Sequence, residues 1–272
     1  MTEATTVIAP EAVERFRRDG AIVLRGVIEP DQVELLAAGV ERNLAAPGDL
    51  AIRTEDPGAS GAFFEDFCNW QRIEEFDRAI RELPLAAAAA ALTGSSEIRL
   101  FHDHVLVKEP GTTTRTPWHQ DQPYYCIDGR RTASFWIPLD PVPRESTLEF
   151  VAGSHAAGTW FMPRTFVEGS PMVFEPGALA DVPDIDADRD AHEILGWSLE
   201  PGDAVVFHML TLHAAAGSRT RRRAFSLRLI GDDVTFAPRP HRTSPPFEGL
   251  ESELEAGAPM DHPLFPLLWP AR

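Results

Sequence analysis

Five short runs rich in β-branched and aromatic residues dominate the chain from Glu97 onward, separated by segments that contain glycine and proline. They are IRLFHDHVLVK, TASFWIPLD, TLEFVAGSH, DAVVFHMLTLH and AFSLRLIG. Strand-length runs divided by turn residues are typical of a sandwich or barrel of antiparallel strands. We therefore predict a jelly-roll-type double sheet as the core of the molecule, over residues 97–236.

The first part of the chain, residues 1–96, has a different pattern. Residues 10–20 start with proline, carry apolar residues at helical spacing and end with glycine, so they predict a short helix that leads into a strand over residues 21–24. Residues 30–46 and 70–92 repeat the helical spacing of apolar residues. This N-terminal part is expected to be mostly helical.

Composition limits the remaining possibilities. The 272 residues are 43% hydrophobic, enough for one domain, mainly β with helical additions, that ends in an extended, proline-rich tail over residues 237–272. The net charge of -17 argues against nucleic acid and anionic membranes as partners. No apolar run is long enough to span a membrane. The N-terminus lacks the pattern of a signal peptide, and Cys68 and Cys126 form no disulfide framework, so we expect a cytoplasmic protein.

One short segment combines residue types that bind metals. His119 and Asp121 lie two residues apart in TPWHQDQPYY, so a strand would place both side chains on the same face. One imidazole and one carboxylate make up half of a divalent-metal site, although such a pair also occurs as an ordinary polar patch. Two histidines and one carboxylate, with open positions on the ion, are the ligands of non-haem Fe(II) oxygenases.

A third ligand must come from elsewhere in the chain. His213 ends the run DAVVFHMLTLH, in which a Pro-Gly-Asp turn starts a strand, and it is our candidate. His208 is the competitor, but Val206 and Leu210 share its face, which favours a buried structural histidine. His155, which follows a strand, is also expected to be structural.

The strand expected after His213 has one polar face. Arg222 and Ser226 alternate with apolar residues in RRAFSLRLIG and therefore share that face. Because arginine binds carboxylates through two hydrogen bonds, Arg222 and Ser226 are candidate anchors for a dicarboxylate cosubstrate. A run of arginines can also be a solvated strand end.

Several of these segments together resemble the phytanoyl-CoA dioxygenase family of Fe(II)- and 2-oxoglutarate-dependent oxygenases. The matching segments are LVKEPG (106–111), PWHQD (117–121), FWIPLDPVPRES (135–146), LEFVAGSH (148–155), LEPGDAVVFH (199–208), His213 and RRAFSLR (222–228). They cover about half of the chain and follow the order found in the family.

The resemblance implies a fold, cofactors and a reaction. The fold is a double-stranded β-helix, cupin-like, in which His119, Asp121 and His213 bind Fe(II) and Arg222 pairs with the distal carboxylate of 2-oxoglutarate. By their positions in the matching segments, Trp136 and His104 are further residues of the cosubstrate pocket. The implied reaction uses O2 to hydroxylate an organic substrate and releases succinate and CO2.

Other residues are candidates because of their position. Lys108, the only lysine in the chain, shares strand parity with His104 and could supply a positive charge to the cosubstrate pocket. Gln122, Tyr124 and Tyr125 follow the first metal ligands and are the candidates for binding substrate. The acidic segment 178–193 is expected to be a mobile loop that covers the site, and the expected substrate is a small or medium metabolite.

Two alternative functions remain open at this point. His102 and His104 form an H-x-H pair on one strand face, which suits a cupin-type metalloenzyme with a different metal site. The chain could also be a jelly-roll protein that binds a ligand without turnover, because a fold does not determine a function.

Overall fold

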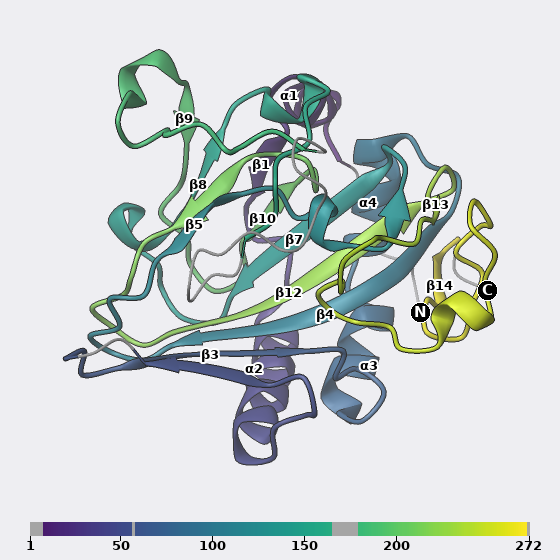
Figure 1. Ribbon diagram of the computed structural model, residues 1–272. Helices are drawn as coiled ribbons and strands as arrows, with labels where there is room; N and C mark the ends of the chain where they lie inside the picture. Colours follow the sequence, from purple (N-terminus) through teal and green to yellow (C-terminus); the bar gives the residue numbers. More distant parts are fainter. Residues whose placement is uncertain (1–7, 56–57, 165–178, 271–272) are drawn as a thin grey trace.

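Two antiparallel sheets form the centre of the protein, whose computed structural model describes residues 8–55, 58–164 and 179–270 (Figure 1). The helices are α1 (Pro10–Asp19), α2 (Pro30–Ala45), α3 (Glu74–Glu82) and α4 (Leu85–Thr93). The strands are β1 (Ala21–Leu24), β2 (Ile52–Glu55), β3 (Ala62–Phe67), β4 (Ile98–Lys108), β5 (Thr116–His119), β6 (Ile127–Asp128), β7 (Thr132–Pro138), β8 (Leu148–Val151), β9 (Ile194–Leu195), β10 (Ala204–Phe207), β11 (His213–Ala215), β12 (Arg222–Gly231), β13 (Thr235–Phe236) and β14 (Leu267–Trp269).

The strand order agrees with the predicted jelly-roll type of fold. The larger sheet has the order β1-β10-β7-β12-β4-β3-β2, with β14 also paired to β4, and the smaller sheet has the order β5-β11-β8-β9. β13 and β6 form a separate pair. The prediction of a mainly β fold with helices near the N-terminus is thus confirmed.

The N-terminal part contributes more to the large sheet than its helical pattern indicated. β1 pairs with β10, as its strand-like sequence allows. β2 and β3, which we did not predict, extend the sheet beyond β4. The polar residues Glu65 and Asp66 in β3 weaken the apolar signal of this strand, and its pairing with β4 stabilises it instead. The large sheet therefore draws strands from outside residues 97–236.

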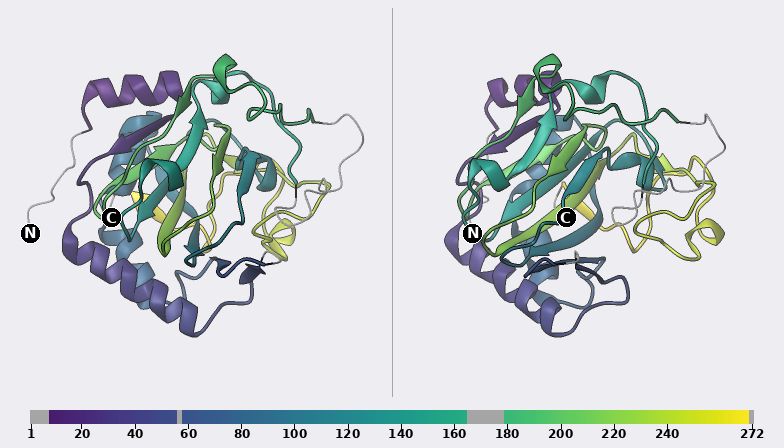
Figure 2. Two further views of the ribbon diagram at one scale, coloured as in Figure 1. Left: turned by 90° about the vertical axis from the view of Figure 1, so that its left-hand side faces the viewer. Right: turned by 60° about the vertical axis from the view of Figure 1, so that its left-hand side comes forward.

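The helices pack on one face of the large sheet (Figure 2). Phe225, Leu227 and Leu229 of β12 point toward them, and the ring of Phe76 in α3 lies 4.5 Å from that of Phe225. α1 begins at a proline and ends at Gly20, whose φ of 77° favours glycine. A Cβ at Gly20 would lie 2.3 Å from Nδ1 of His155, so the turn into β1 also needs the space.

The opposite face of the large sheet meets the small sheet. Trp136, Phe150 and Phe207 pack together between the two sheets. The alternate residues of β12, among them Arg222 and Arg228, are buried on this inner face. The candidate site therefore lies inside the jelly roll rather than on its surface.

The C-terminal segment packs against the core as well as running over it. Leu250 and Phe265 are buried in a cluster with Tyr125, and β14 pairs with β4. Of the acidic segment 178–193, residue 178 lies outside the described residues. In the remainder, Ile185 is buried and Arg189 pairs with Glu149 of β8, so this part is anchored to the small sheet. Over the described ranges, every helix is too short or too polar to cross a bilayer.

Candidate metal centre and cosubstrate pocket

Three predicted ligands converge at one point. His119 ends β5 and His213 begins β11, and these two residues are directly paired across the small sheet. Asp121 follows in a turn with helical backbone angles, where its N–H donates to the carbonyl of Met209. The turn, rather than the continued strand that we expected, brings its carboxylate beside the imidazoles. One ligand atom from each residue lies within 4.8 Å of the others.

The two histidines present the same nitrogen to this point. Nδ1 of His119 donates to the carbonyl of Pro117 at 2.8 Å, and Nδ1 of His213 donates to that of Thr211 at 2.9 Å. Because a carbonyl can only accept, the proton of each neutral ring is on Nδ1 and the lone pair is on Nε2. Burial, reinforced by the neighbouring His119, lowers the pKa of His213 to about 3, which keeps it neutral.

Asp121 completes the centre as the anionic ligand. Its Oδ1 lies 3.6 Å from Nε2 of His119 and 3.6 Å from Nε2 of His213. Its Oδ2 accepts from Nε of Arg228 at 3.0 Å and from Oγ of Ser134 at 3.1 Å. Burial alone would raise the pKa of Asp121, but the Arg228 guanidinium and the two histidines hold it well below its usual value. Two imidazoles that present Nε2 and one ionised carboxylate fit Fe(II).

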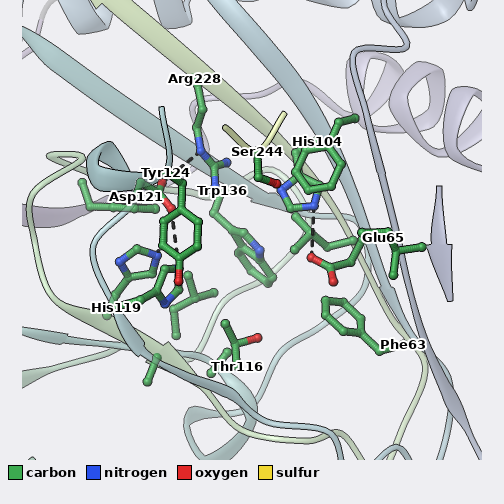
Figure 3. A pocket seen from close by; sticks show the side chains of 18 of the residues that line it. Phe63, Glu65, His104, Thr116, His119, Asp121, Tyr124, Trp136, Arg228 and Ser244 are labelled. Atoms are coloured by element: carbon green, nitrogen blue, oxygen red, sulfur yellow. Dashed lines mark hydrogen bonds and ion pairs between the residues drawn. The ribbon is translucent and has the colours of Figure 1, made fainter. Parts of the chain in front are cut away.

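The three residues lie in the wall of a cavity of about 280 Å³ between the sheets (Figure 3). Its lining is mostly apolar and comes from β2, β3, β4, β5, β7, β8, β10, β11 and β12, together with the segment after β5. The lining residues are Ile52, Thr54, Phe63, Glu65, Phe67, His104, Leu106, Thr116, His119, Asp121, Tyr124, Tyr125, Trp136, Leu148, Arg164, Phe207, His213, Ala214, Ala215, Arg222, Arg228 and Ser244.

Arg222 brings a positive charge into this cavity. It is 6% exposed, its guanidinium donates to the carbonyl of Ser146, and it lies 5.7 Å from the ring centre of Trp136. Burial lowers the pKa of Arg222 to about 10. Within the described residues no carboxylate pairs with it, so a buried cation remains for an anionic ligand to neutralise.

Three other predicted residues are buried outside the lining of the cavity. The hydroxyl of Ser226 donates to the carbonyl of Phe135 and accepts from Arg228, so both of these hydrogen bonds are made within the protein. Gln122 donates its amide to the carbonyl of Gly129. Nζ of Lys108 donates to the carbonyls of residues 114 and 216, each at 2.8 Å. Strand parity predicted that Lys108 would point into the cavity. Its ammonium group instead binds these two backbone carbonyls, and the residue is not part of the lining.

The two tyrosines and His104 do line the cavity. The hydroxyl of Tyr124 donates to the carbonyl of Arg164 at 2.8 Å, and that of Tyr125 accepts from Arg228 at 3.2 Å. His102 instead lies outside the lining, with its ring 5.2 Å from that of Tyr125. Across the described ranges, the one group of three metal-ligand side chains close enough to hold an ion is the His119, Asp121 and His213 set, so the H-x-H alternative lacks a third ligand.

Sequence reasoning missed three charged residues that line this cavity, namely Glu65, Arg164 and Arg228. Arg228 shares the strand face of Arg222, and this parity could have identified it. Glu65 lies on β3, a strand that we did not predict, so nothing in the local sequence related it to residues more than fifty positions away.

Comparison with known proteins agrees with the fold and identifies the family. Residues 16–225 match the model of the family described as phytanoyl-CoA dioxygenase (PhyH). An ectoine dioxygenase from Stutzerimonas stutzeri (strain A1501) is 27% identical over 268 residues, covering 93% of this chain and 87% of that protein. The chain therefore belongs to the phytanoyl-CoA dioxygenase family, and it is a 2-oxoglutarate-dependent dioxygenase.

Solved structures show the same fold in related enzymes. The non-heme alpha ketoglutarate dependent epimerase SnoN from nogalamycin biosynthesis is 23% identical, with a TM-score of 0.75 over 97% of this chain and 98% of that one. The alpha ketoglutarate dependent carbocyclase SnoK from the same biosynthesis is 24% identical, with a TM-score of 0.73 over 96% of each chain. The double-stranded β-helix implied by the sequence motifs is thus confirmed.

Proposed function

We propose that the protein hydroxylates a small or medium organic metabolite, with Fe(II) held by His119, Asp121 and His213. The convergence of these three ligand atoms in the wall of a mostly apolar cavity is the observation that supports this function best. When bound, Fe(II) supplies the chemistry by which O2 and 2-oxoglutarate convert a substrate C–H bond to C–OH, with release of succinate and CO2.

Arg222 holds 2-oxoglutarate in this proposal. A buried guanidinium with no carboxylate partner in the described chain suits the distal carboxylate of a dicarboxylate, since each neutralises the other in a water-poor site. Trp136 packs beside the guanidinium and provides a flat apolar wall for the carbon chain. Arg228 has a separate role, because its pairing with Asp121 keeps that ligand ionised and oriented.

The remaining lining residues position the substrate and exclude water. Leu106, Leu148 and Phe207 surround the space beside the metal ligands with apolar surface. Tyr124 and Tyr125 form the wall next to Asp121, and the backbone of Arg164 fixes the hydroxyl of Tyr124. With substrate bound, an apolar wall of this kind limits the access of water to the reacting centre.

Binding of iron by purified protein tests the metal centre directly. Anaerobic titration with Fe(II) and 2-oxoglutarate should produce a visible charge-transfer band in the wild-type protein, and His213→Ala should abolish it. His192→Ala, which changes a histidine outside the cavity, is the matched control and should leave the band unchanged. Loss of iron with His104→Ala but not with Asp121→Ala would favour the alternative metal site. Screening metabolites for succinate release coupled to a hydroxylated product then tests the reaction.

A further inference from the structure

A second polar site lies in the same cavity, across from the metal ligands (Figure 3). It consists of Glu65 on β3 and His104 on β4, each 6% exposed. Nε2 of His104 lies 3.3 Å from Oε1 of Glu65, but the contact lacks the geometry of a hydrogen bond, and this nitrogen has no hydrogen-bond partner in the described structure. Both side chains point into the cavity.

Among the described residues, no cation is paired with the Glu65 carboxylate, and Arg164, which also lines the cavity, pairs with Asp181. Lys108 donates to backbone carbonyls, Arg228 pairs with Asp121, and Arg222 contacts Ser146 and Trp136. Among the residues that the structure describes, no hydrogen bond reaches the carboxylate of Glu65, and His104 is its one charged or chargeable neighbour within ion-pair distance. A buried carboxylate left in this state destabilises the folded protein unless a ligand supplies a donor.

The surroundings of the pair define the rest of its ligand. Phe67 stacks on His104 with ring centres 3.9 Å apart, and Phe63 lies beside Glu65 on the same face of β3. Ile52, at 46% the most exposed large hydrophobic side chain in the described chain, continues this apolar surface on β2. A ligand here therefore meets one acidic group, one imidazole and a broad apolar wall.

We propose that Glu65 and His104 determine substrate specificity by binding an N–H or O–H donor of the substrate on the side of the cavity opposite the metal. The inference rests on the proposed function of the same site. It assigns to the enzyme an uncharged or cationic amine or alcohol with an apolar body, and it excludes substrates that would place an anionic group against Glu65. This site would hold the polar end of the substrate and thereby select which C–H bond faces the metal.

Burial gives independent support for a ligand that carries a donor. It raises the pKa of Glu65 to about 7, despite the opposing effects of Lys108, His119 and Arg228. Burial also lowers the pKa of His104 well below its usual value, so the imidazole stays neutral and does not neutralise the carboxylate. An amine or alcohol from the substrate would supply the missing partner.

Three probes with one carbon skeleton test this assignment on the metal-free protein. Ligand-observed NMR titration should show that cyclohexylamine and cyclohexanol bind the wild type at least about tenfold more tightly than cyclohexanecarboxylate. Glu65→Gln should weaken the amine about tenfold and the alcohol less, because the amide still accepts a hydrogen bond, whereas Glu65→Leu should weaken both. Glu55→Gln, an exposed position on the adjacent strand β2, is the control and should bind all three probes as the wild type does.

The outcome for Glu65 is separable from that for the metal centre. The charge-transfer band with Fe(II) and 2-oxoglutarate should form in Glu65→Gln as in the wild type. If the band does not form in the wild type, the proposed function is contradicted. Binding of the probes to metal-free protein still tests the role of Glu65 in that case. The specificity assignment is overturned if the carboxylate probe binds as well as the amine, if Glu65→Leu binds the amine and alcohol unchanged, or if neither binds the wild type. The wild-type ranking of the probes decides the matter even if a variant does not fold.

Discussion

Replacing Glu65 by glutamine is expected to change how the stability of the metal-free protein depends on pH. The charged or titratable groups that act on Glu65 are His104 and Lys108 of β4, His119 of β5 and Arg228 of β12. Burial outweighs them and raises the pKa of Glu65 from 4.5 to about 7. A carboxyl group with a raised pKa does not lower the free energy of unfolding below pH 4.5, where it is protonated in both states. It lowers the free energy of unfolding as the pH rises from 4.5 through about 7.

The size of the effect follows from the two pKa values. The raised pKa of Glu65 costs the folded state about 1 kcal/mol at pH 5 and about 3 kcal/mol at pH 8, so the difference is about 2 kcal/mol. Denaturant unfolding gives the free energy of unfolding of the wild type and of Glu65→Gln at each pH. The difference between the two proteins at pH 8 is then compared with that at pH 5, so the effects of groups that titrate in both proteins cancel. Glu55→Gln should show no such dependence. A Glu65→Gln difference that is equal at pH 5 and pH 8, or larger at pH 5, would refute the argument from burial.

Three further substitutions test separate parts of the site and its support. Arg222→Gln should weaken 2-oxoglutarate binding about 100-fold by removing the charge-assisted hydrogen bonds, with little change in Fe(II) affinity, as calorimetry in anaerobic buffer would show. Arg228→Met should lower Fe(II) affinity about 10- to 100-fold although all three ligands remain, which competition with a chelator would measure. Asp103→Ala should destabilise the fold by about 3 kcal/mol without affecting either ligand, because the carboxylate accepts the buried N–H groups of Asn69 and Trp70, and thermal unfolding would detect the loss.

The fold could be predicted where local sequence and tertiary structure agree. The alternation in β12 correctly separated Phe225, Leu227 and Leu229 from the polar face, since burial on two sides of one strand has a period of two. β3 could not be recognised, because Glu65 and Asp66 are buried through tertiary contacts. Asp66 accepts hydrogen bonds from Asn43 and from the backbone of Gly48, which no local pattern contains.

In the candidate site too, some residues could be predicted from the sequence and others depend on tertiary contacts. The pairing of His213 with His119 fulfils what the spacing of motifs suggested, because two strands distant in sequence are adjacent in the small sheet. Strand parity alone misplaced Ser226 and Lys108, which share the correct face but satisfy their hydrogen bonds with backbone carbonyls or neighbouring side chains. Parity restricts which way a side chain points, whereas hydrogen-bond satisfaction decides whether it reaches the cavity.

The two carboxylates of the cavity differ in a way that the local sequence does not show. Asp121 and Glu65 are equally buried, but the guanidinium of Arg228 is bonded to Asp121 and not to Glu65. One carboxylate is therefore ionised at all physiological pH values and suited to a cation, while the other titrates near neutrality and requires a donor from outside the protein. Within the described chain, Arg228 pairs with Asp121 and with no other carboxylate, so its placement on β12 favours the ionised carboxylate at the metal end of the cavity and leaves Glu65 at the other end for a ligand.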